Sequence, residues 1–323
     1  MVRAPDPSAG PVPDVTSDPL PADAPPSLAQ LTAHGGTRVE LPAPDGPIAA
    51  IRGVGSPGPA AALGGESVAI LVPGYSGSKE DFAPLIDPIR AAGIGVLALD
   101  LPGQYESPGP AAEADYRPGP LGLVLADVVR AEAAEGRRVL LLGHSFGGLV
   151  ARAAVLSGAP VRGLTLMDTG PAELPMGRRR TQLDVLEPVL RRRGIEAVVA
   201  LRDESGEWAS VDARVVDLLR RRLLTSTSAG LLGMGDAMRA EPDRVAELVA
   251  AVRGRRVACL VVCGMADDAW SVGVQRTMAD RLEAEFAAVP DAAHAPNVEN
   301  PEGLLDVLLP TWRTWLREDM LEE

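Results

Sequence analysis

A serine in a glycine-rich turn is the first residue of the sequence whose setting suggests chemistry. Residues 143–148 read Gly-His-Ser-Phe-Gly-Gly, so that Ser145 lies in a G-x-S-x-G pattern. Small residues at these positions let a strand turn sharply into a helix and expose the serine hydroxyl at the tip of the turn. The apolar run 138–142 precedes the motif, and 149–156 is a good helix former after it. Ser145 is therefore a candidate nucleophile.

Three histidines compete for the role of the base that this serine would need. A serine hydroxyl is a weak nucleophile near neutral pH unless a base within hydrogen-bond reach accepts its proton. His34 lies at the edge of a proline- and alanine-rich segment, and the side chain of His144 is expected to point away from the exposed tip of the turn. His294 is left by elimination as the candidate base.

Strand-like and helix-like segments alternate through most of the chain. Two short runs, 38–41 and 48–54, flank a turn-forming Ala-Pro-Asp-Gly sequence and predict an opening hairpin. The apolar runs that follow are typical of parallel strands buried on both faces. They cover 68–72, 96–99, 139–142, 164–167, 257–263 and 285–289. Helices are predicted near 82–92, 121–135, from 146, near 272–282, and from 301 to about 317.

The strand pattern stops after Gly170 and returns near residue 255. Between these points the sequence predicts successive amphipathic helices. They lie around 180–193, 195–202, 212–224, 229–238 and 242–253. The chain then divides into four parts. These are a disordered tail rich in Pro, Asp and Ala at 1–35, a first core part at 36–170, a helical insertion at 171–254, and a second core part at 255–323.

The motif and its surroundings together resemble the α/β-hydrolase family. The resemblance rests on the Gly-His-Ser-Phe-Gly-Gly run, on Asp100-Leu-Pro-Gly103 upstream and on the helical insertion downstream, and it covers about residues 38–316. It implies an α/β fold of the α/β-hydrolase type: a mostly parallel sheet flanked by helices, with a helical cap inserted after the sixth strand. It also places a histidine in the loop after the last strand, where His294 lies.

The resemblance further implies an acid that orients the histidine and stabilises its charged form. Gly264-Met-Ala-Asp267 follows a predicted strand and resembles the Gly-x-x-Asp turn of the family, and the chain order serine, acid, histidine agrees with the fold. Asp267 is therefore the preferred acid. Two alternatives remain, Asp268 beside it and Asp168 at the end of the preceding core strand.

Two backbone N–H groups are expected to stabilise the oxyanion that forms when a carbonyl is attacked. By the resemblance, one is the N–H of Phe146, and the other is the N–H of Tyr75 in the loop after strand 68–72. Many family members have His-Gly in this loop, whereas this chain has Pro73-Gly74. This departure keeps the backbone donor but changes the pocket wall, so the substrate class cannot be copied from such relatives.

The resemblance predicts a serine hydrolase that cleaves a small ester, thioester or amide through an acyl-serine intermediate. Two other functions stay open: an acyltransferase or perhydrolase-like enzyme, and a non-catalytic homologue that binds a small molecule. Three arginine triplets, 178–180, 191–193 and 220–222, lie in the insertion. They either clamp an anionic substrate or pair with neighbouring acids on a solvated helix face.

Charge and composition narrow the choice of partners. The formal net charge of −13 argues against nucleic acid, which requires a basic surface. No apolar run approaches the roughly 20 residues of a membrane span, and the first residues do not resemble a signal peptide, so a cytoplasmic location is expected. No motif indicates a metal or cofactor, and Cys259 and Cys263 are too far apart along one strand for a disulfide. The expected partner is a small acyl substrate.

Overall fold

The computed structural model describes residues 28–56, 66–206, 208–209 and 211–318. The disordered tail expected at 1–35 lies mostly outside these residues. Its last part is ordered, because Leu28–Leu31 forms a short 3₁₀-helix, η1, in which Gln30 is buried. The side chain of Gln30 donates a hydrogen bond to Asp81, so this segment is attached to the core.

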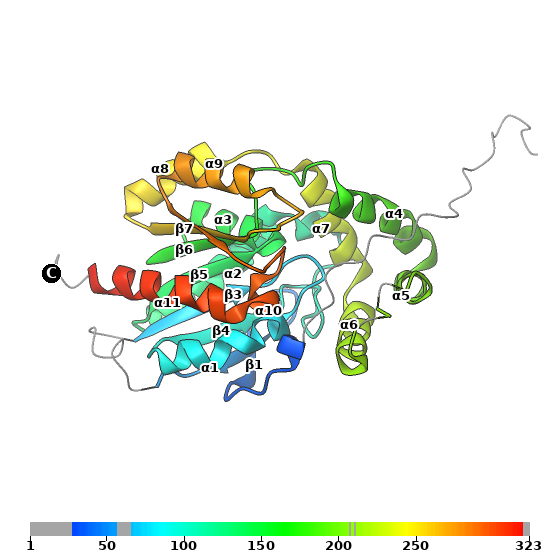
Figure 1. Ribbon diagram of the computed structural model, residues 1–323, viewed down its shortest axis with the longest axis horizontal. Coiled ribbons are helices and arrows are strands. Elements are labelled where there is room, and N and C mark those ends of the chain that lie inside the picture. The colour runs from blue at the N-terminus through cyan, green and yellow to red at the C-terminus, as the bar shows by residue number, and fades with distance from the viewer. Residues whose placement is uncertain (1–27, 57–65, 207, 210, 319–323) are drawn as a thin grey trace, which may run out of the picture.

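Eight strands form one sheet in the order β1-β2-β4-β3-β5-β6-β7-β8 (Figure 1). Strands β1 and β2 form the expected antiparallel hairpin, and β2 pairs antiparallel with β4. All further neighbours pair in parallel. The strands are β1 (Thr37–Leu41), β2 (Ile48–Gly53), β3 (Ser67–Val72), β4 (Gly95–Leu99), β5 (Arg138–His144), β6 (Gly163–Met167), β7 (Ala258–Gly264) and β8 (Glu285–Val289). The predicted α/β architecture with a mostly parallel sheet is confirmed.

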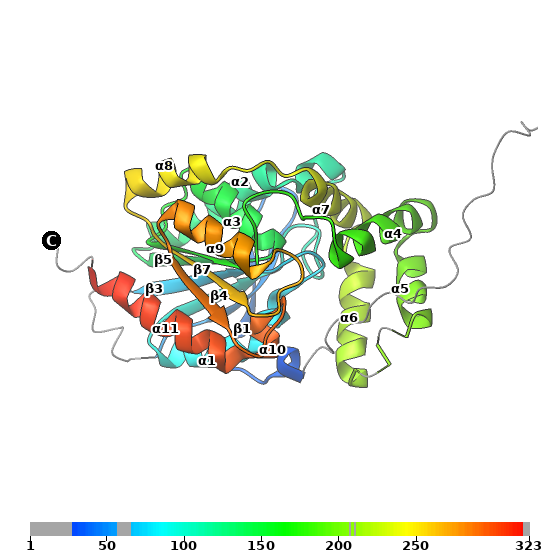
Figure 2. The ribbon, with the colours of Figure 1, turned by 45° about the horizontal axis from the view of Figure 1, so that its top comes forward.

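Helices cover both faces of the sheet, which explains why its strands are apolar along their whole length (Figures 1 and 2). Alternate side chains of a strand enter different layers: Ile70 of β3 packs with one group of helices and Leu71 with the other. The first layer contains α2 (Pro118–Ala134), α3 (Phe146–Leu156), α8 (Val245–Arg255) and α9 (Val272–Leu282), and the second contains α1 (Ala83–Ala91) and α11 (Pro301–Glu318).

The helix expected near 82–92 begins in an irregular way. Residues Lys79–Phe82 form a 3₁₀-helix, η2, and the α-helix starts only at Ala83. Pro84 lies in the first turn, where a proline costs no hydrogen bond because the first N–H groups of a helix have no partner inside it. A further short helix, α10 (Pro296–Glu299), follows the His294 loop and was not predicted.

The insertion after β6 contains four helices that extend beyond the end of the sheet (Figure 2). They are α4 (Arg178–Arg193), α5 (Ile195–Glu204), α6 (Ala213–Thr225) and α7 (Ser228–Ala240). Helix α8, which the sequence assigned to the insertion, packs instead against α3 and α9 beside the sheet. The cap therefore ends before α8, because the apolar side of that helix faces the sheet core.

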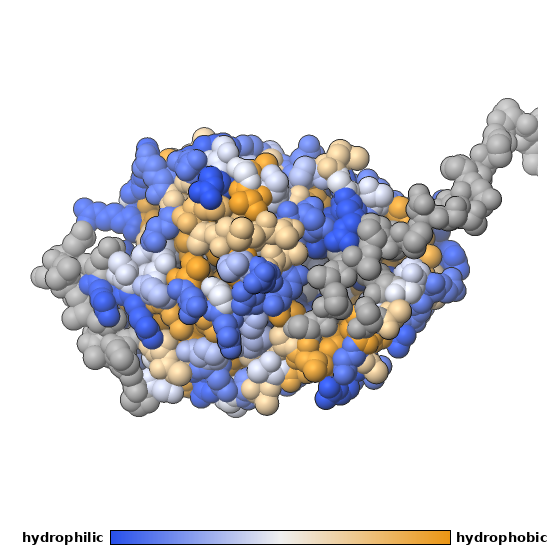
Figure 3. Space-filling view, viewed as in Figure 1, coloured by the Kyte–Doolittle hydropathy of each residue, from blue (hydrophilic) through white to orange (hydrophobic). Residues whose placement is uncertain are grey.

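One face of the molecule carries hydrophobic side chains next to η1 and α6 (Figure 3). Leu28 and Leu31 of η1 and Leu224 of α6 are among the exposed large hydrophobic residues. Within the described ranges no helix is both long and apolar enough to cross a membrane.

Candidate active site

Ser145 occupies the sharp turn between β5 and α3. Its backbone has φ 52° and ψ −120°, an arrangement that is costly for a residue with a side chain. The N–H of Ser145 donates to the carbonyl of Met167 on β6 over 2.8 Å, which helps to hold the turn. Gly147 is required here, because a Cβ at this position would lie 2.4 Å from the carbonyl oxygen of Pro73. The sequence motif therefore folds as the predicted strand, turn and helix.

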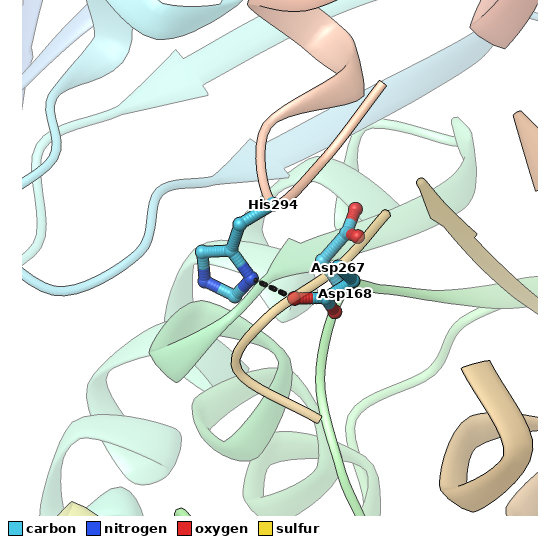
Figure 4. A group of neighbouring side chains, drawn as sticks. All are labelled: Asp168, Asp267 and His294. Carbon is cyan, nitrogen blue, oxygen red and sulfur yellow. Dashed lines mark hydrogen bonds and ion pairs between the residues drawn. The ribbon is translucent and has the colours of Figure 1, made fainter. Parts of the chain in front are cut away.

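His294 and Asp267 lie beside the serine, in loops that follow two neighbouring strands. The Nε2 atom of His294, after β8, is 2.9 Å from the Oγ atom of Ser145. Its Nδ1 atom is 2.8 Å from the Oδ1 atom of Asp267, after β7 (Figure 4). The three side chains, far apart in sequence, form one continuous chain of hydrogen bonds. All three residues are buried.

The Asp267 carboxylate is held by donors other than the histidine. The N–H of Ala269 donates to Oδ1 over 2.8 Å, and the Nε2 group of Gln275 donates to Oδ2 over 2.6 Å. Both groups are donors, so they match the acceptor oxygens of a carboxylate. When this carboxylate accepts the Nδ1–H of a neutral His294 ring, Nε2 is the acceptor that faces the serine. Gln275, on α9, was not identified from the sequence.

The two alternative acids have different partners. The Asp268 carboxylate forms ion pairs with Arg178 and Arg179 at the start of α4, with distances of 2.6 Å to each. Asp168 is fully buried beside Asp267 (Figure 4), and its Oδ1 accepts the N–H of Gly264 over 2.9 Å. Burial and the adjacent Asp267 charge raise the pKa of Asp168 well above its usual range. The Asp168 carboxyl therefore stays protonated to a higher pH than an ordinary aspartic acid.

His144 was expected to point away from the serine, and this expectation is wrong. Its Nε2 atom is 2.6 Å from the carbonyl oxygen of His294, and the two imidazole rings are 5.2 Å apart. Burial and the neighbouring His294 lower the pKa of His144 to about 4, so the ring is neutral near pH 7. The Nε2–H of His144 then donates to the backbone of the His294 loop. No sequence signal distinguishes this from an outward orientation.

Beside Ser145 lies the one group of described residues whose spacing could suit a metal ion. Atoms of Asp168, Asp267 and His294 lie within 4.8 Å of one another. Both oxygens of Asp267 already accept N–H groups, and the nearby nitrogen of His294 faces Asp267 Oδ1 at hydrogen-bond distance. Because a metal ligand must present a lone pair instead of a proton, these residues fit an acid–imidazole pair better than a metal site.

The two N–H groups expected to bind an oxyanion flank the serine. Phe146 is the first residue of α3, where a backbone N–H has no acceptor within the helix. Tyr75 follows Gly74, and a Cβ at Gly74 would lie 3.0 Å from the Cβ of Ser145. Within the described residues neither N–H donates to another protein group. Neither N–H is therefore engaged elsewhere in the described part of the chain.

A cavity of about 250 Å³ opens above Ser145, between the sheet and the cap. Its apolar wall comes mainly from cap residues such as Leu183, Leu186 and Trp208, and from Trp270 beside the His294 ring. Trp208 and Trp270 thus both line the cavity. Its volume and apolar lining suit a small or medium-sized organic group.

The arginine triplets are engaged mostly with acids. Arg191 pairs with Glu113, Glu187 and Asp236, and Arg220 pairs with Asp203. Of the triplet arginines that line the cavity, Arg222 bonds Asp81 over 2.7 Å and Arg179 bonds Asp268. Internal pairing of this kind favours the interpretation of the triplets as a solvated, salt-bridged surface over that of an anion clamp.

Comparison with known proteins places this geometry in a family. The model of the Alpha/beta hydrolase family matches residues 69–307, which include Ser145, Asp267 and His294. No curated protein sequence matches the chain.

Solved structures with the same fold share little sequence with the chain. One is a thermophilic esterase from Thermogutta terrifontis, with 23% identity over 87% of this chain and 98% of that one, and a TM-score of 0.64. Another, described among carboxylesterases of Nitrososphaera gargenis, has 17% identity over 87% and 100%, and a TM-score of 0.67. The enol-lactonase from Burkholderia xenovorans has 19% identity over 86% and 99%, and a TM-score of 0.63. Because the family model spans well over half of its length, the chain belongs to the alpha/beta hydrolase family.

Proposed function

We propose that this hydrolase cleaves a small ester, thioester or amide through an acyl-serine intermediate on Ser145, with His294 as the base and Asp267 as the acid. The observation that carries the proposal is the hydrogen-bonded chain from Ser145 Oγ to His294 and on to Asp267, with distances of 2.9 and 2.8 Å. A serine in this setting can lose its proton to the imidazole as it attacks.

In the first half of the reaction, Oγ of Ser145 bonds to the carbonyl carbon of the substrate while its proton passes to Nε2 of His294. The carbonyl electrons move to oxygen, and the N–H groups of Phe146 and Tyr75 stabilise the resulting oxyanion. When the oxyanion collapses, the bond to the leaving group breaks, and His294 gives the proton to that group. Asp267 stabilises the imidazolium throughout.

In the second half, His294 takes a proton from water, which attacks the acyl-serine and releases a carboxylic acid. Ser145 regains its proton from His294 as the bond to the acyl group breaks. The apolar cap wall of the cavity is the natural place for the acyl chain. Relatives named as esterases and as a lactonase support an ester bond as the first substrate to test.

Hydrolysis of p-nitrophenyl esters with acyl chains of two to eight carbons tests the proposal. Ser145→Ala should lower kcat by about 10⁶-fold, because the nucleophile is removed. Ser157→Ala is the matched control, since Ser157 is the C-cap of the same helix and its hydroxyl donates only to carbonyls of α3. Equal activity of Ser145→Ala and Ser157→Ala would refute the proposal. Adding an alcohol or amine and analysing the products distinguishes hydrolysis from acyl transfer.

A further inference from the structure

The peptide unit between Gly74 and Tyr75 is held from its carbonyl side. The Gly74 oxygen accepts the Nε2–H of Gln104 over 2.7 Å and the N–H of Gly77 over 3.0 Å. Gly74 and Tyr75 line the cavity beside Ser145, whereas Gln104 is completely buried and does not. The carbonyl therefore faces the protein interior.

A trans peptide bond makes the direction of its N–H depend on that of its carbonyl. The unit is planar, with C=O and N–H on opposite sides, and no cis peptide occurs among the described residues. Fixing the Gly74 carbonyl toward Gln104 thus turns the Tyr75 N–H the other way, toward the cavity. Rotation of this one peptide unit would remove the donor from the site without moving Ser145 or His294.

Hydrogen bonds also hold the Gln104 amide in the orientation in which Nε2 faces the Gly74 carbonyl. Its Oε1 accepts the N–H of Leu101 over 3.1 Å, so the amide can present only Nε2 to Gly74. The Sδ atom of Met234, on cap helix α7, is 3.9 Å from the same Nε2. The side chain is fully buried, and both ends of its amide have partners. A buried amide with both ends satisfied is a rigid support.

We propose that Gln104 is a positioning residue that holds the Gly74–Tyr75 peptide so that the Tyr75 N–H donates to the oxyanion. The inference rests on the proposed function, because it concerns the donor of that reaction. The other residues of the site lie in the loops and turns that follow β3, β5, β7 and β8, whereas Gln104 lies in the loop after β4. Gln104 touches no substrate and acts only through the backbone of Gly74.

The test replaces Gln104 with two side chains of similar size. Gln104→Met removes the donor, and kcat for a short p-nitrophenyl ester should fall by about 10- to 100-fold while KM changes by less than about threefold, because only the transition state uses this N–H. Affinity for a trifluoromethyl ketone, which forms a tetrahedral adduct with the serine, should fall by the same factor as kcat/KM. A general loosening of the fold would not link these two quantities.

Gln104→Glu supplies a second readout that does not depend on the first variant folding. A protonated glutamic acid can donate to the Gly74 oxygen, whereas a carboxylate repels it. The kcat of Gln104→Glu relative to the wild type should therefore rise as the pH falls. Ser226→Ala is the control, because it removes a different hydrogen bond from the same loop, that of Tyr105 N–H to Ser226 Oγ, and should change kcat by less than about twofold.

The outcomes separate this inference from the proposed function. If the wild type hydrolyses esters but Gln104→Met keeps kcat and ketone affinity within about twofold, the role of Gln104 is refuted and the function stands. If the kcat of Gln104→Glu relative to the wild type does not change with pH, the role of Gln104 is likewise refuted. If the wild type neither hydrolyses esters nor binds the ketone, the proposed function itself fails.

Discussion

The sheet core and the cap differ in what holds them together. The strands and their flanking helices enclose two large apolar clusters, one on each face of the sheet. The helices α4, α5 and α6 share a much smaller cluster, to which Leu186, Leu190 and Val198 belong. Ion pairs join this part to the core, among them those of Arg178 and Arg179 with Asp268, and Leu183 of α4 also packs into the core cluster.

The side chains proposed for catalysis and the wall of the cavity come from different parts of the molecule. Ser145, Asp267 and His294 come from loops after core strands, whereas much of the apolar wall of the cavity comes from the cap. The hydrogen bonds that connect the three core side chains do not involve the cap. We therefore expect changes in the core to alter kcat, and changes at the junction with the cap to alter mainly KM.

After the loss of Ser145 itself, the largest effect is expected at the core acid. Asp267→Asn should lower kcat for ester hydrolysis by about 10⁴-fold, because the amide cannot stabilise the imidazolium and favours the wrong tautomer of His294. Steady-state kinetics with a short ester measure it. Asp268→Asn is the matched comparison from the adjacent position, and a similar loss in both variants would show that the two acids are not divided between core and cap.

A second core prediction concerns the buried Asp168. The pKa of Asp168 is higher in the folded protein than in the unfolded chain. At a pH between these two pKa values, Asp168 is protonated in the folded protein and ionised in the unfolded chain. The contribution of Asp168 to stability is therefore present at acidic pH and is lost as the pH rises through the folded-state pKa. Asp168→Asn cannot ionise, so its stability relative to the wild type should increase with pH.

Urea unfolding of both proteins over a series of pH values measures this difference. An asparagine is of similar size and places an amide donor beside Asp267, so kcat should stay within about tenfold of the wild type. A stability difference that is constant with pH would show that Asp168 titrates normally in the folded protein.

The junction between core and cap is tested by Asp268→Asn. Losing the pairs with Arg178 and Arg179 should raise KM for a long-chain ester about two- to fivefold and leave kcat nearly unchanged. This change in KM corresponds to the free energy that a partly exposed ion pair contributes. A large loss of kcat with unchanged KM would mean that the cap junction also positions the catalytic side chains.

The smallest effect is expected within the cap itself. Asp212 caps the N-terminus of α6, where its side chain accepts the N–H of Arg214. Asp212→Ala should weaken this helix end by about 1 kcal/mol. Faster hydrogen exchange in α6 peptides, with unchanged exchange in α3, would reveal it. Asp217→Ala, an exposed position of the same helix, should leave the exchange unchanged, and equal effects of both variants would contradict a capping role.

Periodicity and apolar runs predicted most of the core because its strands are buried on both faces. The hairpin, the parallel strands and the helices on the sheet all follow such patterns. The end of the cap was misplaced because α8 is amphipathic like the helices before it, and only tertiary packing distinguishes the face that meets α3 and α9. The ordering of Leu28–Leu31 likewise depends on a long-range bond, that of Gln30 to Asp81.

The sequence named the three side chains that form one chain of hydrogen bonds. A serine motif, a chain with only three histidines and the resemblance of 264–267 to the Gly-x-x-Asp turn of the family left few choices. The residues that support them could not be found in this way. The bond from His144 to the His294 carbonyl and that from Gln104 to the Gly74 carbonyl depend on where loops meet in space. Neither leaves a pattern in the local sequence.

Covalent labelling tests the role of Ser145 most directly. A fluorophosphonate reacts with a serine only when its hydroxyl is activated, and digestion with mass spectrometry then identifies the modified peptide. We expect one adduct on the peptide that contains Ser145, no adduct in Ser145→Ala, and labelling in His34→Ala as in the wild type but strongly slowed in His294→Ala. An adduct on another serine, or none on the folded wild-type protein, would contradict the assignment.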